Sequence, residues 1–481
     1  MSGAWPNGAK ECAVCGLDAS PFETAECSVV CPECESVHFE RLATRDQHNE
    51  WTAAKSWEVR DGRTHLLRSL ASLVAKHRPN GGKILDVGCS VGKFLDCLPN
   101  TVWEKTGLDP SSCAIDQARM TTVASWLVST MEDVDLPENY YDVVTILDAI
   151  YYSSAPRVLL EKAVRVLKPG GLLVVEMPNK AYVLRRRVGW VRTLVDSPES
   201  RRLRFDDAQT CLPSTVGILS VLLRSRCSID ALQPLGPPLR RSPITRRGSA
   251  VLGAALTLAY RATQGVVDAC PKLVIVAVKP SGCRLPRDEM GIDYRAARTS
   301  DLPAVARLHE VCFPPPDRGS VASVIEAWYS HVLGQGVDVT VASRAKGGVV
   351  GFAEVRWRGG GTVVKRIRAL DRPPGLYSLA DRGFASLVKG RYTRQENCAG
   401  VELRAVGTEP ALRSAGIGSN LIGLASRAAC ARAPKIHAWV SLANTASVIG
   451  FMQNGYVLRR VRVTPHEHEG LFVKVSSSGV A

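Results

Sequence analysis

The stretch KILDVGCSVGKFL, residues 83–95, constrains the fold of this chain more than any other. An apolar run leads directly into a turn that contains Gly88 and Gly92, and a helical pattern follows. Glycine permits a tight turn and lets the backbone approach a ligand closely, and the first turn of a helix offers free N–H groups. The stretch therefore predicts a strand, a ligand-binding turn and a helix.

The residues after this turn repeat the alternation of strand and helix. TVWEKTGLDPS places Asp109 at the tip of a second strand, where a carboxylate can accept both hydroxyls of a ribose. Two more buried strands are expected in residues 140–152, with Asp148 at the strand end, and in residues 165–179. Residues 271–280 are the expected last strand. This alternation predicts a doubly wound, Rossmann-like α/β sheet with its ligand at the carboxyl ends of the strands.

Four cysteines near the start form a C-x2-C…C-x2-C pattern with 15 residues between the pairs. This spacing can bring four thiolates into the tetrahedral range of Zn²⁺, with Gly16 as the turn after the first pair. The alternative is four unrelated buried cysteines, and Cys27 is a spare ligand with a less suitable spacing. Four protein ligands would close the site, so the zinc is expected to be structural. The predicted metal ligands are Cys12, Cys15, Cys31 and Cys34.

The motifs DVGCSVG, GLDPS, MEDVDLP, YDVVTILDAI and RVLKPGGLLVVEMPN together resemble the class I S-adenosylmethionine-dependent methyltransferases. They are most similar to the small-molecule and sugar-type branch that carries an N-terminal zinc ribbon. The resemblance implies S-adenosylmethionine as the cofactor, with its methionine end at the glycine turn, its ribose on the second strand and its adenine near the MEDV segment. The residues implied are Asp86, Gly88, Cys89, Gly92, Asp109, Met131 and Glu132.

The sequence departs from this family pattern at two points. Ser90 stands where the family has the middle glycine of the turn, which is compatible with the turn if its φ is negative. Tyr151-Tyr152 replace a Glu-His pair that is common after the fourth strand. If that histidine is a base in relatives, Asp148 at the floor of the substrate pocket or one of the tyrosines must serve here, or no base is used. Methyl transfer from a sulfonium is an in-line displacement, so alignment can supply much of the acceleration.

A second glycine-rich stretch, RSAGIG at residues 413–418, follows the expected strand at 400–407 and opens an amphipathic helix. Consecutive N–H groups in such a turn can bind a pyrophosphate. The turn is too short for a P-loop and has no Gly-Lys-Ser/Thr. A separate pattern of strands and helices begins at residue 292, with Ser300 or Asp301 as the expected cap of its first helix.

These features, with ANTASVIGFMQNGY at residues 443–456, resemble the GNAT-type N-acetyltransferases over about residues 292–475. The resemblance implies acetyl-CoA, with its pantetheine arm beside the backbone of Val406 and beside Asn444. Phe451 stands where relatives often have a tyrosine that reprotonates the departing thiolate. The residues implied for the pyrophosphate turn are Arg413, Ala415, Gly416, Ile417, Gly418 and Ser419, and the candidate bases are Glu354 and Glu402.

Length and composition agree with several globular domains in one chain. The chain has 481 residues, 45% of them hydrophobic and 22% charged. The expected domains are a zinc ribbon (1–50), a methyltransferase domain (51–281) with a substrate-covering region (180–270), a linker (282–291) and an acetyltransferase domain (292–481). No secretory signal and no bilayer-spanning stretch is visible, and 15 scattered cysteines are not a disulfide framework. We therefore expect a cytoplasmic protein with no membrane partner.

The net charge of +15 is concentrated in one segment. Residues 180–261 hold 14 Arg and one Lys against five acidic residues. Such a segment can attract an anionic or phosphorylated small molecule, a cofactor or nucleic acid, and a solvated arginine-rich surface is an equal alternative.

The preferred interpretation is a bifunctional enzyme that methylates and N-acetylates one small molecule, such as an amino sugar or a specialised metabolite. The alternative is an rRNA- or tRNA-modifying methyltransferase with an accessory or degenerate acetyltransferase domain. The aromatic content of 6% disfavours this alternative, because RNA-binding surfaces use aromatic side chains to stack bases.

Overall fold

The computed structural model divides the chain into two compact units, Met1–Gly282 with Val461–His468 and Cys283–Arg460 with Glu469–Ala481. The residues that the structure describes are 5, 9–16, 22–23, 28–39, 64–179, 210–235, 272–281, 292–313, 322–333, 337–344, 348–358, 400–412, 416–463 and 468–475. The arginine-rich parts of the predicted substrate-covering region, the predicted linker and Cys27 lie outside these residues. No helix among the described residues is long and apolar enough to cross a bilayer.

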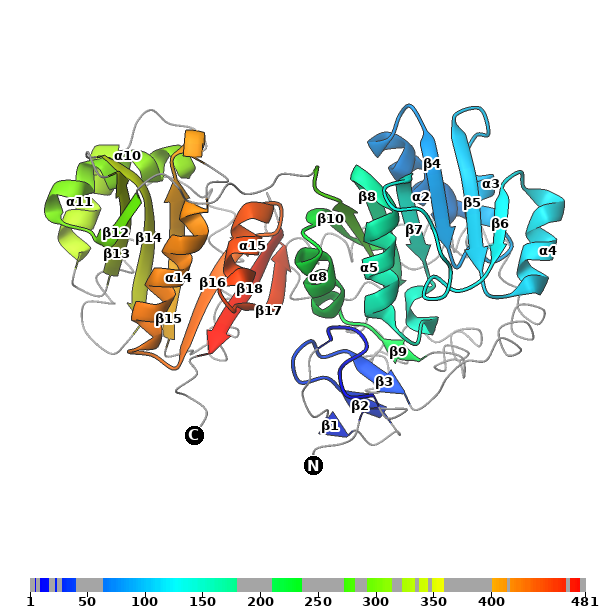
Figure 1. Cartoon of the computed structure of the whole chain (residues 1–481), viewed down its shortest axis with the longest axis horizontal. Coiled ribbons are helices and arrows are strands. Elements are labelled where there is room, and N and C mark those ends of the chain that lie inside the picture. Colours follow the sequence, from blue (N-terminus) through cyan, green and yellow to red (C-terminus); the bar gives the residue numbers. More distant parts are fainter. Residues whose placement is uncertain are drawn as a thin grey trace, which may run out of the picture. The chain divides into compact units, whose positions relative to one another are not determined.

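The centre of the first unit is a seven-stranded sheet. Its strands in chain order are β4 (Gly82–Val87), β5 (Trp103–Asp109), β6 (Ser125–Val128), β7 (Tyr141–Leu147), β8 (Leu167–Pro178), β10 (Ser228–Leu235) and β11 (Lys272–Val278). In space they follow the order β10-β11-β8-β7-β4-β5-β6 (Figure 1). The strands from β8 to β6 are parallel, which confirms the predicted Rossmann-like sheet. The predicted last strand, β11, runs antiparallel, and β10 pairs along its outer edge.

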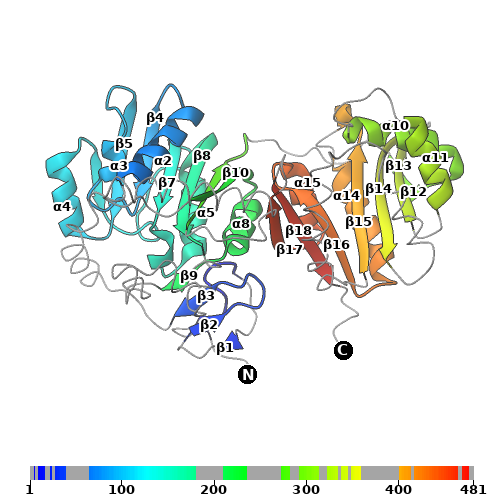
Figure 2. The same ribbon diagram turned by 180° about the vertical axis from the view of Figure 1, so that it is seen from behind.

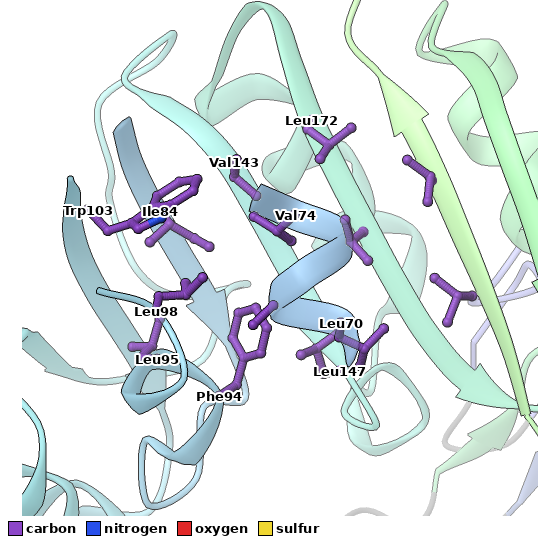
Figure 3. Close-up of a cluster of buried hydrophobic side chains, with 14 residues drawn as sticks. Leu70, Val74, Ile84, Phe94, Leu95, Leu98, Trp103, Val143, Leu147 and Leu172 are labelled. Carbon is purple, nitrogen blue, oxygen red and sulfur yellow. The ribbon is translucent and has the colours of Figure 1, made fainter. Parts of the chain in front are cut away.

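Helix α2 (Thr64–His77) covers one face of this sheet (Figures 2 and 3). Its apolar stripe buries Leu70 and Val74, because residues four apart lie on the same side of a helix. The side chains buried with them come from strands, from α3 (Lys93–Asp96) and from the residues just after it: Ile84, Phe94, Leu95, Leu98, Trp103, Val143, Leu147, Leu172, Val174, Val274 and Val276. The helix ends at His77, before Pro79, which disfavours helical backbone in the residue that precedes it.

Helices α5 (Pro156–Val166) and α8 (Thr215–Arg224) contact each other on the other face of the sheet (Figure 1). Helix α8 starts where the Ser214 hydroxyl oxygen accepts from the Gly217 N–H at 2.9 Å, an N-cap that replaces a missing helical hydrogen bond. The remaining α-helices in the described part of this unit are α3 (Lys93–Asp96) and α4 (Ser112–Thr121), which follow β4 and β5.

The cysteine-bearing segment forms a small antiparallel sheet with a strand from far along the chain (Figure 1). The strands are β1 (Phe22–Glu23), β2 (Ser28–Val30), β3 (Val37–Phe39) and β9 (Cys211–Leu212). Because β9 pairs with β3, this segment is not closed on itself: its fourth strand comes from the region that the sequence assigns to the substrate cover.

The second unit is also built on a seven-stranded sheet. Its strands are β12 (Ile292–Ala296), β13 (Val337–Arg344), β14 (Val349–Arg358), β15 (Gly400–Thr408), β16 (Lys435–Ser441), β17 (Val457–Val463) and β18 (His468–Val475), in the spatial order β12-β13-β14-β15-β16-β18-β17. The pair β15–β16 is parallel, whereas β12 to β15 and the pair β16–β18 are antiparallel. Its α-helices, as far as the structure describes them, are α10 (Leu302–Cys312), α11 (Ala322–Val332), α14 (Ile417–Cys430) and α15 (Thr445–Gln453).

Asp301 precedes α10, but its side chain does not cap that helix as predicted. Its carboxylate accepts from the Arg298 N–H at 2.7 Å and pairs with the Arg295 guanidinium at 2.6 Å. The reason is that Asp301 already belongs to a short 3-10 turn, Thr299–Asp301, so its side chain reaches back to the start of that turn.

Candidate functional sites

The first glycine turn follows β4 and is tightly packed. Gly88 and Gly92 both have left-handed backbone, with φ of 72° and 73°. A Cβ on Gly88 would lie 2.4 Å from the Ala149 Cβ, and one on Gly92 would lie 2.5 Å from the Trp126 ring. Both positions therefore require glycine, as the sequence predicts, and the turn lies directly against the residue that follows Asp148.

Ser90, in the middle of this turn, also has left-handed backbone, with φ of 48°. The condition under which a serine fits this turn, a negative φ, is therefore not met. The turn brings the Ser90 N–H to 2.8 Å from Asp109 Oδ2, and this hydrogen bond helps to hold a conformation that is unfavourable for a residue with a Cβ.

The Asp109 carboxylate joins the turn to the next strand. Its Oδ2 accepts from the Ser90 N–H, and its Oδ1 accepts from the Ser111 N–H at 2.9 Å. The side chain is therefore fixed at the carboxyl end of β5 by two backbone donors, close to the glycine turn.

Asp86 and Cys89 are buried on either side of Gly88. Asp86 Oδ1 accepts from the Thr145 hydroxyl at 2.7 Å. Burial, together with the charges of Asp109 and Asp86, raises the pKa of the Cys89 thiol well above its usual value. Cys89 therefore stays protonated and contributes its backbone and volume rather than a nucleophile.

Met131 and Glu132 lie on the loop after β6. Met131 is buried, and the Glu132 carboxylate accepts a hydrogen bond from the Ser153 hydroxyl. The Lys162 ammonium donates to the Glu132 carbonyl oxygen. These contacts connect the loop to the residues that follow β7.

A cluster of charged and phenolic groups surrounds Asp148. Asp148 Oδ1 accepts from the Tyr151 hydroxyl at 2.8 Å, and Oδ2 lies 2.8 Å from Lys272 Nζ. The same ammonium is 2.7 Å from Oε1 of Glu176, which is fully buried. Asp148 has φ of 59°, and its N–H donates to the Glu176 carbonyl oxygen at 2.9 Å. Tyr152 stacks at a tilt on Tyr151, with ring centroids 4.4 Å apart.

The sequence reasoning identified Asp148, Tyr151 and Tyr152 but missed Lys272 and Glu176. A signal was present, because an acid inside the apolar run LLVVEMP and a lysine that opens the run KLVIVAV are both unusual in buried strands. Their pairing depends on β11 lying beside β8, with Leu273 opposite Met177, which the sequence does not reveal.

The four predicted cysteine ligands converge. Their sulfur atoms all lie within 4.8 Å of one another and are buried. The Cys12–Cys34 and Cys15–Cys31 sulfur pairs are 3.8 and 3.7 Å apart. A tetrahedral site with Zn–S bonds of 2.3 Å requires sulfurs about 3.8 Å apart. The four thiols therefore fit a structural Zn²⁺.

The two cysteine pairs have matching backbone turns. The Cys15 N–H points to the Cys12 sulfur at 3.4 Å, and the Cys34 N–H points to the Cys31 sulfur at 3.5 Å. Each turn closes with a left-handed residue, Gly16 after the first pair and Glu35 after the second. The sequence reasoning found the first of these residues and missed the second, because glutamate carries no signal for a positive φ.

His38 is a neighbour of the cluster that the sequence reasoning missed. Its Nε2 lies 3.2 Å from the Cys12 sulfur, and its ring packs edge-on against Trp5. Burial lowers the pKa of His38 to about 4, so the ring is neutral and can offer one N–H to the sulfur.

Comparison with known proteins identifies the central part of the first unit. Residues 85–175 match the family model described as a methyltransferase domain. These residues run from the end of β4 to β8 and include the glycine turn, Asp109 and Asp148. Residues 85–175 are a class I methyltransferase domain.

Curated relatives of the methyltransferase domain share about a quarter of this chain. The ubiquinone biosynthesis O-methyltransferases of Bradyrhizobium diazoefficiens and Alkalilimnicola ehrlichii are each 30% identical over 107 and 106 residues. These matches cover 21% of this chain and 42% and 43% of the relatives. The corresponding enzyme of Proteus mirabilis is 27% identical over 146 residues, 27% of this chain and 59% of the relative. The chain thus spans about half the length of these relatives.

Two solved structures of methyltransferases are similar to part of this chain. One is a methyltransferase from Haloferax volcanii in complex with the Trm112 methyltransferase activator, with a TM-score of 0.34 and 21% identity, covering 50% of this chain and 100% of that chain. The other is geranyl diphosphate C-methyltransferase from Streptomyces coelicolor, with a TM-score of 0.31 and 15% identity, covering 44% of this chain and 75% of that chain.

The second glycine-rich turn precedes α14 in the second unit. Gly416 has left-handed backbone, with φ of 79°, and stands at the N-terminus of this helix. Ile417 is buried, and the Ser419 carbonyl oxygen accepts from the Asn454 amide at 2.8 Å. Gly418 faces Thr408 of β15, 3.6 Å from the position of a Cβ. The predicted Arg413 and Ala415 lie outside the described residues.

The parallel strands of the second unit pair only where they begin. In the described strands, β15 and β16 share the pairs Val401–Ile436 and Glu402–His437 and then separate. Val406 therefore lies on the part of β15 that pairs with β14 alone, opposite Ala353. Asn444 caps α15, where its Oδ1 accepts from the Ser447 N–H at 3.1 Å.

Phe451, which replaces the expected tyrosine, and the candidate base Glu354 both have structural contacts in the second unit. Phe451 is buried, edge-on to Tyr456 and stacked on Phe472. The Tyr456 hydroxyl lies 2.7 Å from the Ser426 hydroxyl, and burial raises the pKa of this tyrosine. Glu354 is fully buried, accepts from the Tyr329 hydroxyl at 2.8 Å and pairs with the Arg356 guanidinium. Glu402 lies at the last residue pair before β15 and β16 separate.

Proposed function

We propose that this chain is a bifunctional group-transfer enzyme, which methylates with S-adenosylmethionine in its first unit and N-acetylates with acetyl-CoA in its second. The observation that carries the first half is the Asp109 carboxylate, held by two backbone N–H groups at the end of β5 beside the glycine turn. A carboxylate fixed in this place can accept hydrogen bonds from both hydroxyls of a ribose. Because its side chain is already ordered, binding costs little side-chain entropy.

We assign each part of S-adenosylmethionine to its own group of residues. Its methionine end would lie along the turn of Asp86, Gly88, Cys89 and Gly92, its ribose on Asp109, and its adenine near Met131 and Glu132. When bound, this cofactor supplies the electrophilic methyl group. The left-handed glycines are consistent with a role in which backbone N–H groups, rather than side chains, approach the ligand.

The acceptor would lie at Asp148. Its carboxylate is shared between the Tyr151 hydroxyl and the Lys272 ammonium, so we assign it the role of holding a hydroxyl or amine of the acceptor. Because Asp148 is already paired with a cation, it is better suited to orient a donor than to remove a proton. Alignment of the acceptor with the methyl group would then provide most of the acceleration.

The acetyl-transfer half is supported by the turn before α14 and by the separation of β15 from β16. Gly416, Ile417, Gly418 and Ser419 place free N–H groups of a helix start at the turn, where a pyrophosphate would bind. The free edge of β15 around Val406 can pair with the amide groups of the pantetheine arm. Phe451 cannot return a proton to the thiolate, so water would serve. Glu402, at the last residue pair before β15 and β16 separate, is the candidate base.

We also propose that Cys12, Cys15, Cys31 and Cys34 hold one structural Zn²⁺. The sulfur distances of 3.7 and 3.8 Å support this assignment. All four thiols are buried, so the ion would have no open coordination position and would stabilise the fold rather than act on substrate.

The first test is binding of each cofactor by titration calorimetry with the full chain. We expect S-adenosylhomocysteine and CoA to bind the wild type, each at one site. Asp109→Ala should weaken S-adenosylhomocysteine by at least tenfold, about 1.4 kcal/mol, and leave CoA unchanged, because Asp109 lies in the first unit. Equal affinity in both proteins would refute the assigned ribose site.

The acceptor would be sought with labelled S-adenosylmethionine and labelled acetyl-CoA incubated with a bacterial extract, which is then separated into RNA, protein and small molecules. We expect both labels to appear in one small molecule. Methyl label in the RNA fraction would favour the RNA-modifying alternative over this proposal. If only one of the two labels were transferred, the unit that transferred none would be interpreted as a scaffold.

A further inference from the structure

Strand β9 connects the cysteine segment to the acceptor end of the methyltransferase domain. On one side it pairs with β3, and the Phe39 N–H donates to the Thr210 carbonyl oxygen at 3.0 Å. On the other side the Thr210 N–H donates to the Tyr151 carbonyl oxygen, also at 3.0 Å. Thr210 therefore lies between the cysteine segment and the turn that carries Tyr151.

The Thr210 hydroxyl strengthens this connection. It donates to the Ser153 carbonyl oxygen and lies 3.2 Å from the Tyr151 carbonyl oxygen. Thr210 is only 8% exposed, so these hydrogen bonds form away from water. Loss of such a donor leaves a buried carbonyl without a hydrogen bond, which costs the full desolvation free energy of that group.

The turn held by Thr210 reaches both ends of the proposed methyl-transfer site. The Tyr151 hydroxyl donates to Asp148 at the acceptor end, and the Ser153 hydroxyl donates to Glu132 at the adenine end. A shift of this turn would therefore move the groups that orient the acceptor.

The other end of β9 is fixed to the second cysteine pair. The Ser214 N–H donates to the Ser36 hydroxyl oxygen at 3.0 Å, and the Ser214 hydroxyl donates to the Cys34 carbonyl oxygen. The Ser36 hydroxyl also lies 3.2 Å from the Cys34 sulfur. The chain from the sulfurs to the Tyr151 turn is thus continuous: Cys34, Ser36, Ser214, β9, Thr210.

We propose that Thr210 is a positioning residue through which the four-cysteine metal site holds the Tyr151–Ser153 turn, so that metal occupancy controls the order of the acceptor end. This inference rests on the proposed zinc and methyltransferase functions. Strands β2 and β3 have three residues each, too few to be stable alone. Without the ion, β3 would therefore become disordered and its pairing with β9 would be lost. The hydrogen bonds from Thr210 would then no longer hold the Tyr151–Ser153 turn.

The test uses hydrogen exchange measured by mass spectrometry on the full chain. Zinc is removed with a thiol-reactive mercurial and a chelator, and its release is measured by a colorimetric zinc indicator. We expect exchange in peptides covering residues 148–153 to accelerate about tenfold, while peptides covering β5 remain unchanged. Thr210→Val should cause a similar local acceleration with zinc still bound, about fivefold to tenfold for the lost hydroxyl, and Thr210→Ser should restore protection.

Three results would overturn the proposal. Unchanged exchange at residues 148–153 after zinc release would show that the turn does not depend on the ion. Equal acceleration in β5 would show a general stabilising role instead of local positioning. Failure of Thr210→Ser to restore protection would show that the hydroxyl is not responsible. Zinc content and S-adenosylhomocysteine binding of the wild type test the underlying functions separately, so failure of those functions is distinguishable from failure of this inference.

Discussion

Lys272 is the shared cation of the charged cluster around Asp148. Its ammonium pairs with both Asp148 and the fully buried Glu176, so Lys272→Met would leave two carboxylates close together without their shared cation. We expect the free energy of unfolding of the first unit, measured in urea at pH 8, to fall by about 2–3 kcal/mol. This is below the 3–5 kcal/mol of fully buried pairs because the lysine side chain is 24% exposed.

The pH dependence of this loss identifies its cause. In Lys272→Met, burial without the cation would raise the folded-state pKa of Glu176 above its unfolded value of about 4.3. The penalty is therefore complete above the raised pKa and shrinks as pH falls toward the unfolded pKa. We expect a smaller deficit at pH 5 than at pH 8. Lys272→Arg, which keeps the charge, is the matched control, and a deficit independent of pH would indicate a packing defect instead.

Ser90 offers a test of backbone strain in the cofactor turn. Its φ of 48° is unfavourable for a side-chain-bearing residue, and its side chain is exposed. Ser90→Gly should stabilise the first unit by about 0.5–1 kcal/mol, since the strain relieved exceeds the added entropy of the unfolded chain. Urea unfolding measures this difference, with Ser90→Val, which should destabilise, as the comparison. A less stable Ser90→Gly would contradict the interpretation.

At the scale of an element, α15 depends on its N-cap. Asn444 Oδ1 accepts from the Ser447 N–H, so Asn444→Ala should lower the stability of the second unit by about 1 kcal/mol. Asn444→Asp keeps a capping oxygen and should restore stability. If Asn444 also lies beside the pantetheine arm, CoA affinity will stay reduced in Asn444→Asp. Calorimetric unfolding and CoA titration separate the two roles, and an unchanged stability in Asn444→Ala would refute the cap.

At the scale of the whole molecule, the two units should respond to different ligands. Each has its own buried core, around Leu70 and Val74 in the first and around Tyr329 and Phe352 in the second. We expect two transitions in scanning calorimetry. S-adenosylhomocysteine at a hundredfold excess over its Kd should stabilise one transition by about 2.7 kcal/mol, zinc removal should lower the same transition, and CoA should raise the other. If CoA raised neither transition, the proposed acetyl-transfer function of the second unit would be refuted.

Much of the first unit could be predicted from the sequence because its signals are local. The turn of Gly88 and Gly92 and the apolar strands around it require only neighbouring residues, and the cysteine spacing fixes the knuckles in the same way. The φ of Ser90 could not be predicted, since it is set by the hydrogen bond to Asp109 on the next strand. The failure of Asp301 as a helix cap has a similar cause, because a competing turn and Arg295 take its carboxylate.

The sequence by itself determined the parallel core of the first sheet, the glycine turn after its first strand and the convergent cysteines. Only the tertiary structure decided which distant groups meet. It placed Lys272 between Asp148 and Glu176, separated β15 from β16 after two residue pairs, and inserted Thr210 between the cysteine segment and Tyr151. The reason is physical: turns and helices depend on contacts a few residues apart, whereas buried ion pairs and added strands depend on packing between segments whose separation leaves no pattern in the sequence.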